Sequence, residues 1–249
     1  MRRTFVRALA LVSFAFLVGC AGQRPDLSTK LGDAAFAEVL GPLGNGVPTR
    51  QVVVVLASDD APPEESRFVM VAVYEASEVG GPFSRVLGPF PGVVGARGFA
   101  SPGEKREGDK MSPTGRFTIT ELFGADPDFR PKLPYKLVTE EDVWSEDPSS
   151  PMYNQWIRVD PSRTDLDRLK REDDLYRHAA VIDYNRWPVV PGAGSAIFMH
   201  KAEPDGAGTL GCVGLSTGDL DAVLLRLDPA MKPTIVMGRP RDLVATGGR

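Results

Sequence analysis

The sequence predicts a mainly β fold, a sandwich or an open barrel, with one helix packed against it late in the chain. Glycine (26 residues) and proline (22 residues) are frequent among the 249 residues, which suits many short strands joined by turns. Most apolar segments are short and rich in β-branched residues, as strands are. Only one segment, near the C-terminus, combines a helix cap with a clear helical period.

The first two strands form a predicted hairpin. Residues 51–57 include four consecutive valines, which is typical of a buried strand, and residues 67–76 form a second apolar run after a proline-containing turn. Later strands are expected to build the rest of the sheet. In chain order they are 84–87 and 93–94 (both weak), 115–122, 156–159, 178–182, 195–200 and 234–237.

The clearest predicted helix follows Ser216, a residue type that caps helix N-termini. Its apolar face is formed at positions i, i+3, i+4 and i+7 by Leu220, Val223, Leu224 and Leu227, and Pro229 ends it. Two weaker helices are expected, one between Ser28 and Gly41 and a charged surface helix over 162–175.

The N-terminus has the pattern of an export signal. Three arginines precede a short apolar stretch, residues 8–18, which is too short to span a membrane as a helix. The stretch ends in Leu17-Val18-Gly19-Cys20, which resembles a bacterial lipobox and predicts a diacylated Cys20 as the first mature residue. The alternative is ordinary signal cleavage near Ala21 or Gly22. Lipidation would place the protein in the periplasm, anchored to a membrane.

The charge of the chain argues against nucleic acid as a partner. The formal net charge is −4, and loss of residues 1–19, which carry three arginines and no acidic residue, would bring it near −7. No second apolar run is long enough to cross a bilayer, so the N-terminal lipid is the only membrane attachment expected.

Cys212 is the candidate nucleophile and His200 its candidate base. If Cys20 carries lipid, Cys212 is a lone thiol in an oxidising compartment, and such a residue is either reactive or a small buried core residue. His200 ends an apolar strand twelve residues earlier, and the intervening loop is rich in glycine. A neighbouring imidazole can take the proton of a thiol, and the amides of Gly211 and Cys212 are candidates for an oxyanion hole.

His178 is the other histidine, and its place within an apolar strand favours a core or satellite role over catalysis. Two histidines and one free cysteine give no metal-ligand spacing, and no phosphate-binding or dinucleotide-binding glycine motif is present. The sequence therefore predicts neither a metal nor a cofactor.

The segment Thr209-Leu210-Gly211-Cys212-Val213-Gly214-Leu215 after His200 resembles the active-site signature of the L,D-transpeptidase catalytic-domain family. A second segment, Lys105 to Phe117, is similar to the family's "Gly-Asp, then Thr/Ser-Pro-x-Gly-x-Phe" motif. The resemblance covers about residues 50–238. It implies a β-sandwich-like domain with a helix after the cysteine, and acyl transfer on the peptide stems of bacterial peptidoglycan.

The resemblance also assigns roles to residues. Cys212 would attack the amide between an L-centred diamino acid and a terminal D-Ala to give a thioester, with His200 as base. Gly211, Thr209 and Val213 would form the oxyanion and substrate loop. This chain departs from the family's common pattern, because Leu210 replaces a histidine and Gly214 an arginine. Gly214 offers no side chain to a substrate carboxylate, so the enzyme is expected to tolerate stems whose terminal carboxylate is absent or amidated, unless another cation substitutes. The nearby candidates for that are Lys201, Arg186, Lys105 and Arg106.

Three functions remain open at this point. The first is a lipid-anchored transpeptidase, the second a hydrolase of the same bonds (a carboxypeptidase or an amidase), and the third a non-catalytic wall-binding lipoprotein. The predicted organisation is a signal peptide (1–19), a tether with a possible short helix (20–48), the catalytic domain (49–240) and a tail (241–249).

Overall fold

The structure is a computed structural model, and it describes residues 27, 31–41, 48–163 and 165–245. The predicted signal peptide and Cys20 lie outside these residues. No helix among the described residues has the length and the apolar character needed to cross a bilayer.

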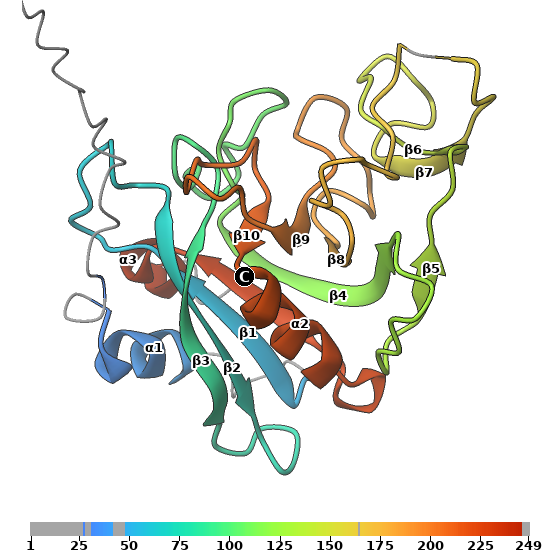
Figure 1. The fold of residues 1–249 in the computed structure, drawn as a ribbon. Coiled ribbons are helices and arrows are strands. Elements are labelled where there is room, and N and C mark those ends of the chain that lie inside the picture. Colours follow the sequence, from blue (N-terminus) through green and yellow to red (C-terminus); the bar gives the residue numbers. More distant parts are fainter. Residues whose placement is uncertain (1–26, 28–30, 42–47, 164, 246–249) are drawn as a thin grey trace, which may run out of the picture.

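Eight strands close into a barrel-like ring, which confirms the mainly β fold (Figure 1). Around the ring they are β11 (Thr234–Gly238), β1 (Gln51–Leu56), β2 (Phe68–Glu75), β3 (Ser84–Val93), β10 (Val213–Leu215), β9 (Phe198–Lys201), β8 (Ala179–Ile182) and β4 (Gly115–Gly124). The ring closes because β11 pairs with β1 in parallel and with β4 in antiparallel. The short strand β5 (Tyr135–Leu137) adds to β4. A separate hairpin is formed by β6 (Asp142–Ser145) and β7 (Gln155–Arg158).

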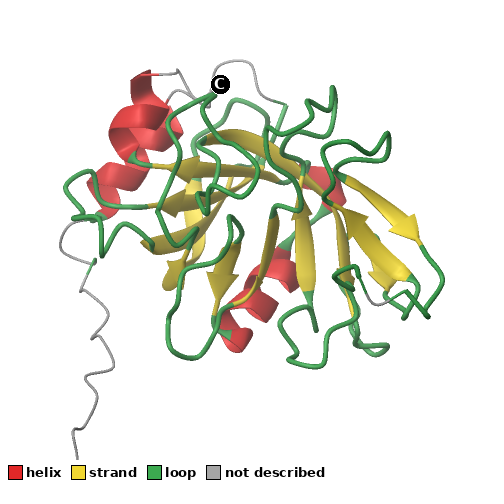
Figure 2. Ribbon diagram, turned by 90° about the horizontal axis from the view of Figure 1, so that it is seen from above, coloured by secondary structure: helices red, strands yellow, loops and turns green. Residues whose placement is uncertain are grey.

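Strand β1 is buried on both faces because different elements cover the two sides of the sheet. In β1, Val53 and Val55 belong to the main core, whereas Val52 and Val54 pack with the N-terminal helix. This explains why the sequence shows a run of valines rather than alternation with polar residues. Figure 2 shows the helices on opposite sides of the strands.

Helix α2 (Thr217–Arg226) covers the inner side of the sheet, as the periodicity predicts. The Ser216 hydroxyl caps it by accepting a hydrogen bond from the Asp219 amide at 3.3 Å. Leu220, Val223 and Leu224 are buried in the main core. Each such side chain contributes about 1.5–3 kcal/mol by leaving water, so this helix is held mainly by its apolar face.

Helices α1 (Asp33–Leu40) and α3 (Pro240–Ala245) contact each other and cover the outer face of β1 and β2. Phe36 is buried there and lies 5.9 Å, ring centre to ring centre, from Tyr74 of β2. Leu27 and Leu31 are buried in the same cluster. The segment before β1 therefore packs on the barrel from Leu27 onward wherever the structure describes it.

Two local expectations are wrong. Residues 84–93 form one strand rather than two, because β3 pairs with β2 along most of its length and a register shift absorbs Gly88-Pro89. The described residues of 162–175 form turns rather than a helix. Here Asp160 and Asp173 accept hydrogen bonds from the amides of Ser162 and Leu175, two residues on, and such local bonds compete with a helix.

Candidate active site

The sheet itself brings His200 next to the cysteine loop. β9 and β10 are parallel neighbours, and His200 of β9 is in register with Gly214 of β10. Cys212 directly precedes β10. In β9, Met199 belongs to the main core. Phe198 packs in a separate cluster, called the outer cluster here, which also contains Cys212, Phe123, Trp144 and Leu169. The alternation predicted for this strand thus places His200 on the same side as Phe198 and Cys212.

His200 and Cys212 line one cavity of about 260 Å³. Its other lining residues are Arg171, Leu175, Tyr176, Glu203, Ala207, Gly208, Thr209 and Leu210. A larger hollow of about 520 Å³ lies between α1 and the β2–β3 hairpin, but neither a thiol nor an imidazole lines it. The chemistry therefore favours the smaller cavity as the active site.

The Cys212 thiol is held by backbone groups. Sγ accepts a hydrogen bond from the Phe198 amide at 3.3 Å and donates one to the Ala196 carbonyl at 3.2 Å. Among the described residues these are its partners, and His200 is not one of them. Burial raises the pKa of the Cys212 thiol to about 12, although the hydrogen bond from the Phe198 amide lowers it. The resting thiol is therefore neutral.

The His200 ring is fixed by the residue that follows it. Nδ1 lies 2.7 Å from the Lys201 carbonyl, and because a carbonyl only accepts, Nδ1 carries the proton. Burial lowers the pKa of His200 to about 4, while the same hydrogen bond raises it. At neutral pH the ring is thus uncharged, with the lone pair on Nε2. The Tyr176 ring packs edge-on against it at 5.2 Å between ring centres.

The loop that carries Cys212 is held in shape by the hydroxyl group of Thr209. Thr209 Oγ1 donates to the Cys212 carbonyl at 2.7 Å and accepts from the Gly211 amide at 3.1 Å. An oxyanion would therefore compete with Thr209 for the Gly211 amide. Val213 is fully buried in the main core, so its side chain has a packing role. Of the three residues predicted for this loop, Thr209 alone lines the cavity.

The segment Lys105 to Phe117, which carries the second family-like motif, contacts the cysteine loop through Ser112. Ser112 is fully buried, and its Oγ donates to the Gly211 carbonyl at 2.6 Å and accepts from the Gly95 amide at 2.9 Å. Sequence analysis did not single out Ser112. The only available signal was its place in the motif, because the contact joins residues 99 positions apart.

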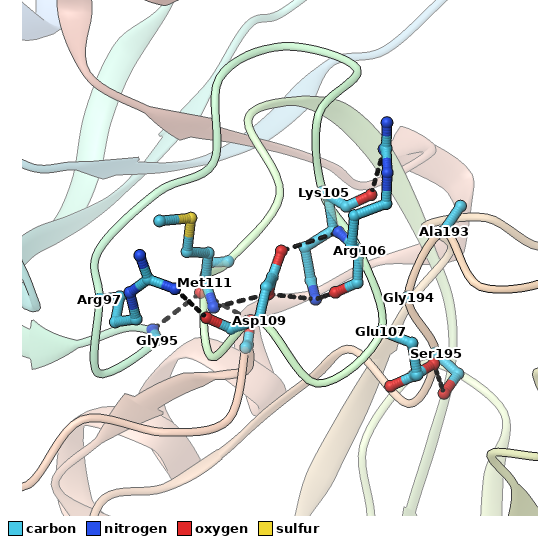
Figure 3. A network of polar contacts seen from close by, with 12 residues as sticks. Gly95, Arg97, Lys105, Arg106, Glu107, Asp109, Met111, Ala193, Gly194 and Ser195 are labelled. Carbon is cyan, nitrogen blue, oxygen red and sulfur yellow. Dashed lines mark hydrogen bonds and ion pairs between the residues drawn. The ribbon is translucent and has the colours of Figure 1, made fainter.

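An ion pair between Lys105 and Asp109 holds the same segment in a turn (Figure 3). Lys105 Nζ donates to Asp109 Oδ1 at 2.7 Å and to the Arg106 carbonyl at 2.6 Å. Burial by itself would raise the pKa of Asp109, but hydrogen bonds from Lys105 and from the Arg106 and Met111 amides bring it below its usual range. The Gly-Asp of this motif thus shapes the loop that carries Ser112.

Comparison with protein-family models matches residues 67–236 to the L,D-transpeptidase catalytic domain, also called YkuD. The match covers well over half of the chain and includes both motifs and the cavity. The chain belongs to the L,D-transpeptidase catalytic-domain family. Members of this family are generally catalytic and act on the peptide stems of peptidoglycan. The searches of curated proteins and of solved structures gave no match.

The neutral thiol of this L,D-transpeptidase-family site predicts a steep pH dependence of alkylation. A thiol pKa near 12 instead of 9.0 lowers the thiolate fraction at neutral pH roughly a thousandfold. In a Cys20→Ala background, we expect the rate of Cys212 alkylation by iodoacetamide to rise about tenfold per pH unit from pH 7 to above pH 10. Mass spectrometry of the modified peptide measures it. A plateau below pH 8 would contradict the neutral dyad.

None of the four cations considered as substitutes for the family's arginine lines the cavity of Cys212, although the charge of Lys105 lowers the pKa of that thiol. Lys201 lines a different cavity, and Lys105 is buried against Asp109. Arg186 pairs with Glu121 and Asp183, and Arg106 donates to backbone carbonyls. Arg171 is the arginine that lines the cavity of Cys212.

Gly214 itself has no room for a side chain. A Cβ atom there would lie 2.9 Å from Val93 Cγ2 and 3.1 Å from Ala202 Cβ. Val93 of β3 and Ala202, just after β9, therefore occupy the space that a side chain at position 214 would need.

His178 lies between helix α2 and the loop after β4. It is buried, with Nδ1 2.6 Å from Asp221 of α2 and Nε2 3.3 Å from Asp126, and its ring stacks on Phe129. It thereby links α2 to the loop after β4. This histidine lines a separate cavity from Cys212.

Proposed function

We propose that this protein is a cysteine acyltransferase that cross-links the peptide stems of peptidoglycan. The observation that carries the proposal is the shared cavity of Cys212 and His200, which lies within the residues matched to the L,D-transpeptidase catalytic domain. The tautomer of His200 also supports it. Nδ1 donates to the Lys201 carbonyl, so the unprotonated Nε2 can act as the base.

The proposed reaction starts from the neutral pair. The Cys212 thiol leaves its bonds to Phe198 and Ala196 and turns to His200, whose Nε2 takes the proton as Sγ attacks the stem amide. The bond from Sγ to the carbonyl carbon forms. The bond to the nitrogen of the terminal D-Ala breaks, and the imidazolium protonates that nitrogen.

The second half of the reaction restores the enzyme. An amine of another stem attacks the thioester, the bond from Sγ to carbon breaks, and the proton of the amine returns through His200 to the thiol. Because burial holds both groups neutral at rest, the charge pair exists only during the reaction. The free enzyme therefore holds only a small fraction of thiolate at neutral pH.

Product analysis tests the proposal. The protein is incubated with tetrapeptide stems, and the acyl-enzyme and the products are identified by mass spectrometry. We expect a thioester on Cys212 and dimeric stems. Shortened stems without dimers would show that water resolves the thioester, and the protein would then be a hydrolase. The absence of any adduct, with stems and with a carbapenem, would overturn cysteine acyl transfer.

We further propose that Cys20 carries lipid and anchors the domain at a periplasmic membrane face. The support is the lipobox-like segment that ends at Cys20. Stable anchoring needs two acyl chains, since one binds only marginally. We expect Cys20→Ala to move the protein from the membrane fraction to the soluble periplasmic fraction, as followed by immunoblot, while Cys212→Ala stays with membranes. Membrane retention of Cys20→Ala would refute the anchor.

A further inference from the structure

The cavity of Cys212 has two charged side chains in its lining, Arg171 on one segment and Glu203 on another. Arg171 belongs to the turns that precede β8, whereas Glu203 follows β9 and stands three residues after His200. The remaining lining residues are apolar, small or uncharged at neutral pH, apart from the neutral thiol and imidazole. A ligand in this cavity therefore meets one cationic and one anionic side chain.

Arg171 is held in place by its own neighbours. Its Nε donates to Asp173 Oδ1 at 2.9 Å, and the guanidinium carbon lies 5.4 Å from the centre of the Tyr176 ring. Tyr176 in turn packs against His200. Asp173 occupies the Nε–Nη2 edge, and no interaction among the described residues uses Nη1. Nη1 is thus without a hydrogen-bond partner among the described residues, in an arginine that lines the same cavity as His200.

Glu203 has no ion-pair partner among the described residues. Its backbone is fixed, because the Gly206 amide donates to the Glu203 carbonyl at 3.1 Å and Arg67 Nε donates to the Gly206 carbonyl at 3.2 Å. The exposed carboxylate therefore stands at the cavity on an anchored turn, without a cation of its own.

We propose that Arg171 and Glu203 make this cavity selective for a zwitterionic substrate group, with Arg171 binding its carboxylate and Glu203 its ammonium. The free end of a diamino dicarboxylic acid in a peptide stem carries both charges on one carbon atom. This inference rests on the proposed function for its substrate, but it concerns binding alone. A charge-assisted hydrogen bond to either group is strong enough to favour the zwitterion about ten- to a hundredfold over a neutralised analogue.

The test measures binding without turnover. Tripeptide stems that lack the terminal D-Ala cannot acylate the enzyme, so they act only as competitors that protect Cys212 from iodoacetamide at pH 8. Three are compared: one with 2,6-diaminopimelate as third residue, one with the side-chain carboxylate amidated, and one with the side-chain amine acetylated. We expect the first to protect at a ten- to a hundredfold lower concentration than the other two.

The variants assign each charge to a residue. Arg171→Met should abolish the preference over the amidated stem, and Glu203→Gln the preference over the acetylated stem. Arg163→Met is a matched control, because Arg163 forms the same fork with Asp165 (Nε to Oδ1 3.0 Å) but does not line the cavity. Asp205→Asn is the control for Glu203 on the same turn. Both controls should keep the wild-type preferences.

Two results would overturn the inference: equal protection by all three stems, or a preference that survives in both Arg171→Met and Glu203→Gln. Failure of the proposed function is a separate outcome. If tetrapeptide stems form no thioester while the zwitterionic tripeptide still protects Cys212 selectively, the acyl transfer is refuted and the binding assignment stands.

Discussion

Replacement of Cys212 by alanine is expected to abolish acyl transfer, with a loss on the order of 10⁴- to 10⁶-fold. Removal of a nucleophile leaves only the rate supported by binding and by backbone donors. The measurement is the rate of dimer formation together with the mass of the trapped acyl-enzyme. The substitution removes one small side chain from the outer cluster, so the circular dichroism spectrum should be unchanged.

Cys212→Ser provides the matched comparison for this loss. A serine hydroxyl can keep the hydrogen bonds to the Phe198 amide and the Ala196 carbonyl, but it is a far weaker nucleophile at neutral pH. Both variants should therefore be folded and inactive. Activity within tenfold of the wild type in the alanine variant would refute Cys212 as the nucleophile, whatever the serine variant does.

Asn154→Ala is expected to lower the free energy of unfolding by about 3–5 kcal/mol, because each buried partner left unpaired costs about 1–3 kcal/mol. Asn154 is 1% exposed. Its Oδ1 accepts from Trp144 Nε1 at 2.8 Å and from the Ala196 amide at 3.1 Å. Its Nδ2 donates to the Tyr184 and Asn185 carbonyls at 3.0 and 2.8 Å. Urea denaturation measures the effect.

Asn185→Ala is the control for the loss of an asparagine from a left-handed backbone position. Asn185 has φ of 52°, close to the 57° of Asn154, and its side chain also bonds to backbone groups. It is only partly buried, so water replaces its lost partners and we expect a cost of about 1–2 kcal/mol. Equal destabilisation by the two substitutions would contradict the argument from burial.

The sequence predicts strands well where packing on both faces makes them apolar. The valine run of β1 and the capped face of α2 are examples, since both patterns follow from burial alone. The predicted helix over 162–175 fails because helical periodicity is judged from leucines, whereas the aspartates decide the local backbone. Leu169 is buried, but it reaches the outer cluster from a turn.

The site is predictable in its chemistry and not in its surroundings. His200 and Cys212 are rare residue types in a short segment, and strand alternation places them together. Arg171 has no such signal, because Arg171 with Asp173 and Arg163 with Asp165 look alike in the sequence. Only the path of the chain around the cavity distinguishes them. The neutral resting state of the dyad depends on burial, which a sequence does not give.

The packing of Leu27 on the barrel limits how far an anchored enzyme can work from its membrane. With Cys20 acylated, as proposed, the seven residues from Cys20 to Leu27 span at most about 25 Å even when fully extended. That is less than the diameter of a compact domain of this size, roughly 40 Å. The lipid would then keep the domain close to the bilayer, and the enzyme would reach only the layer of cell wall next to the membrane.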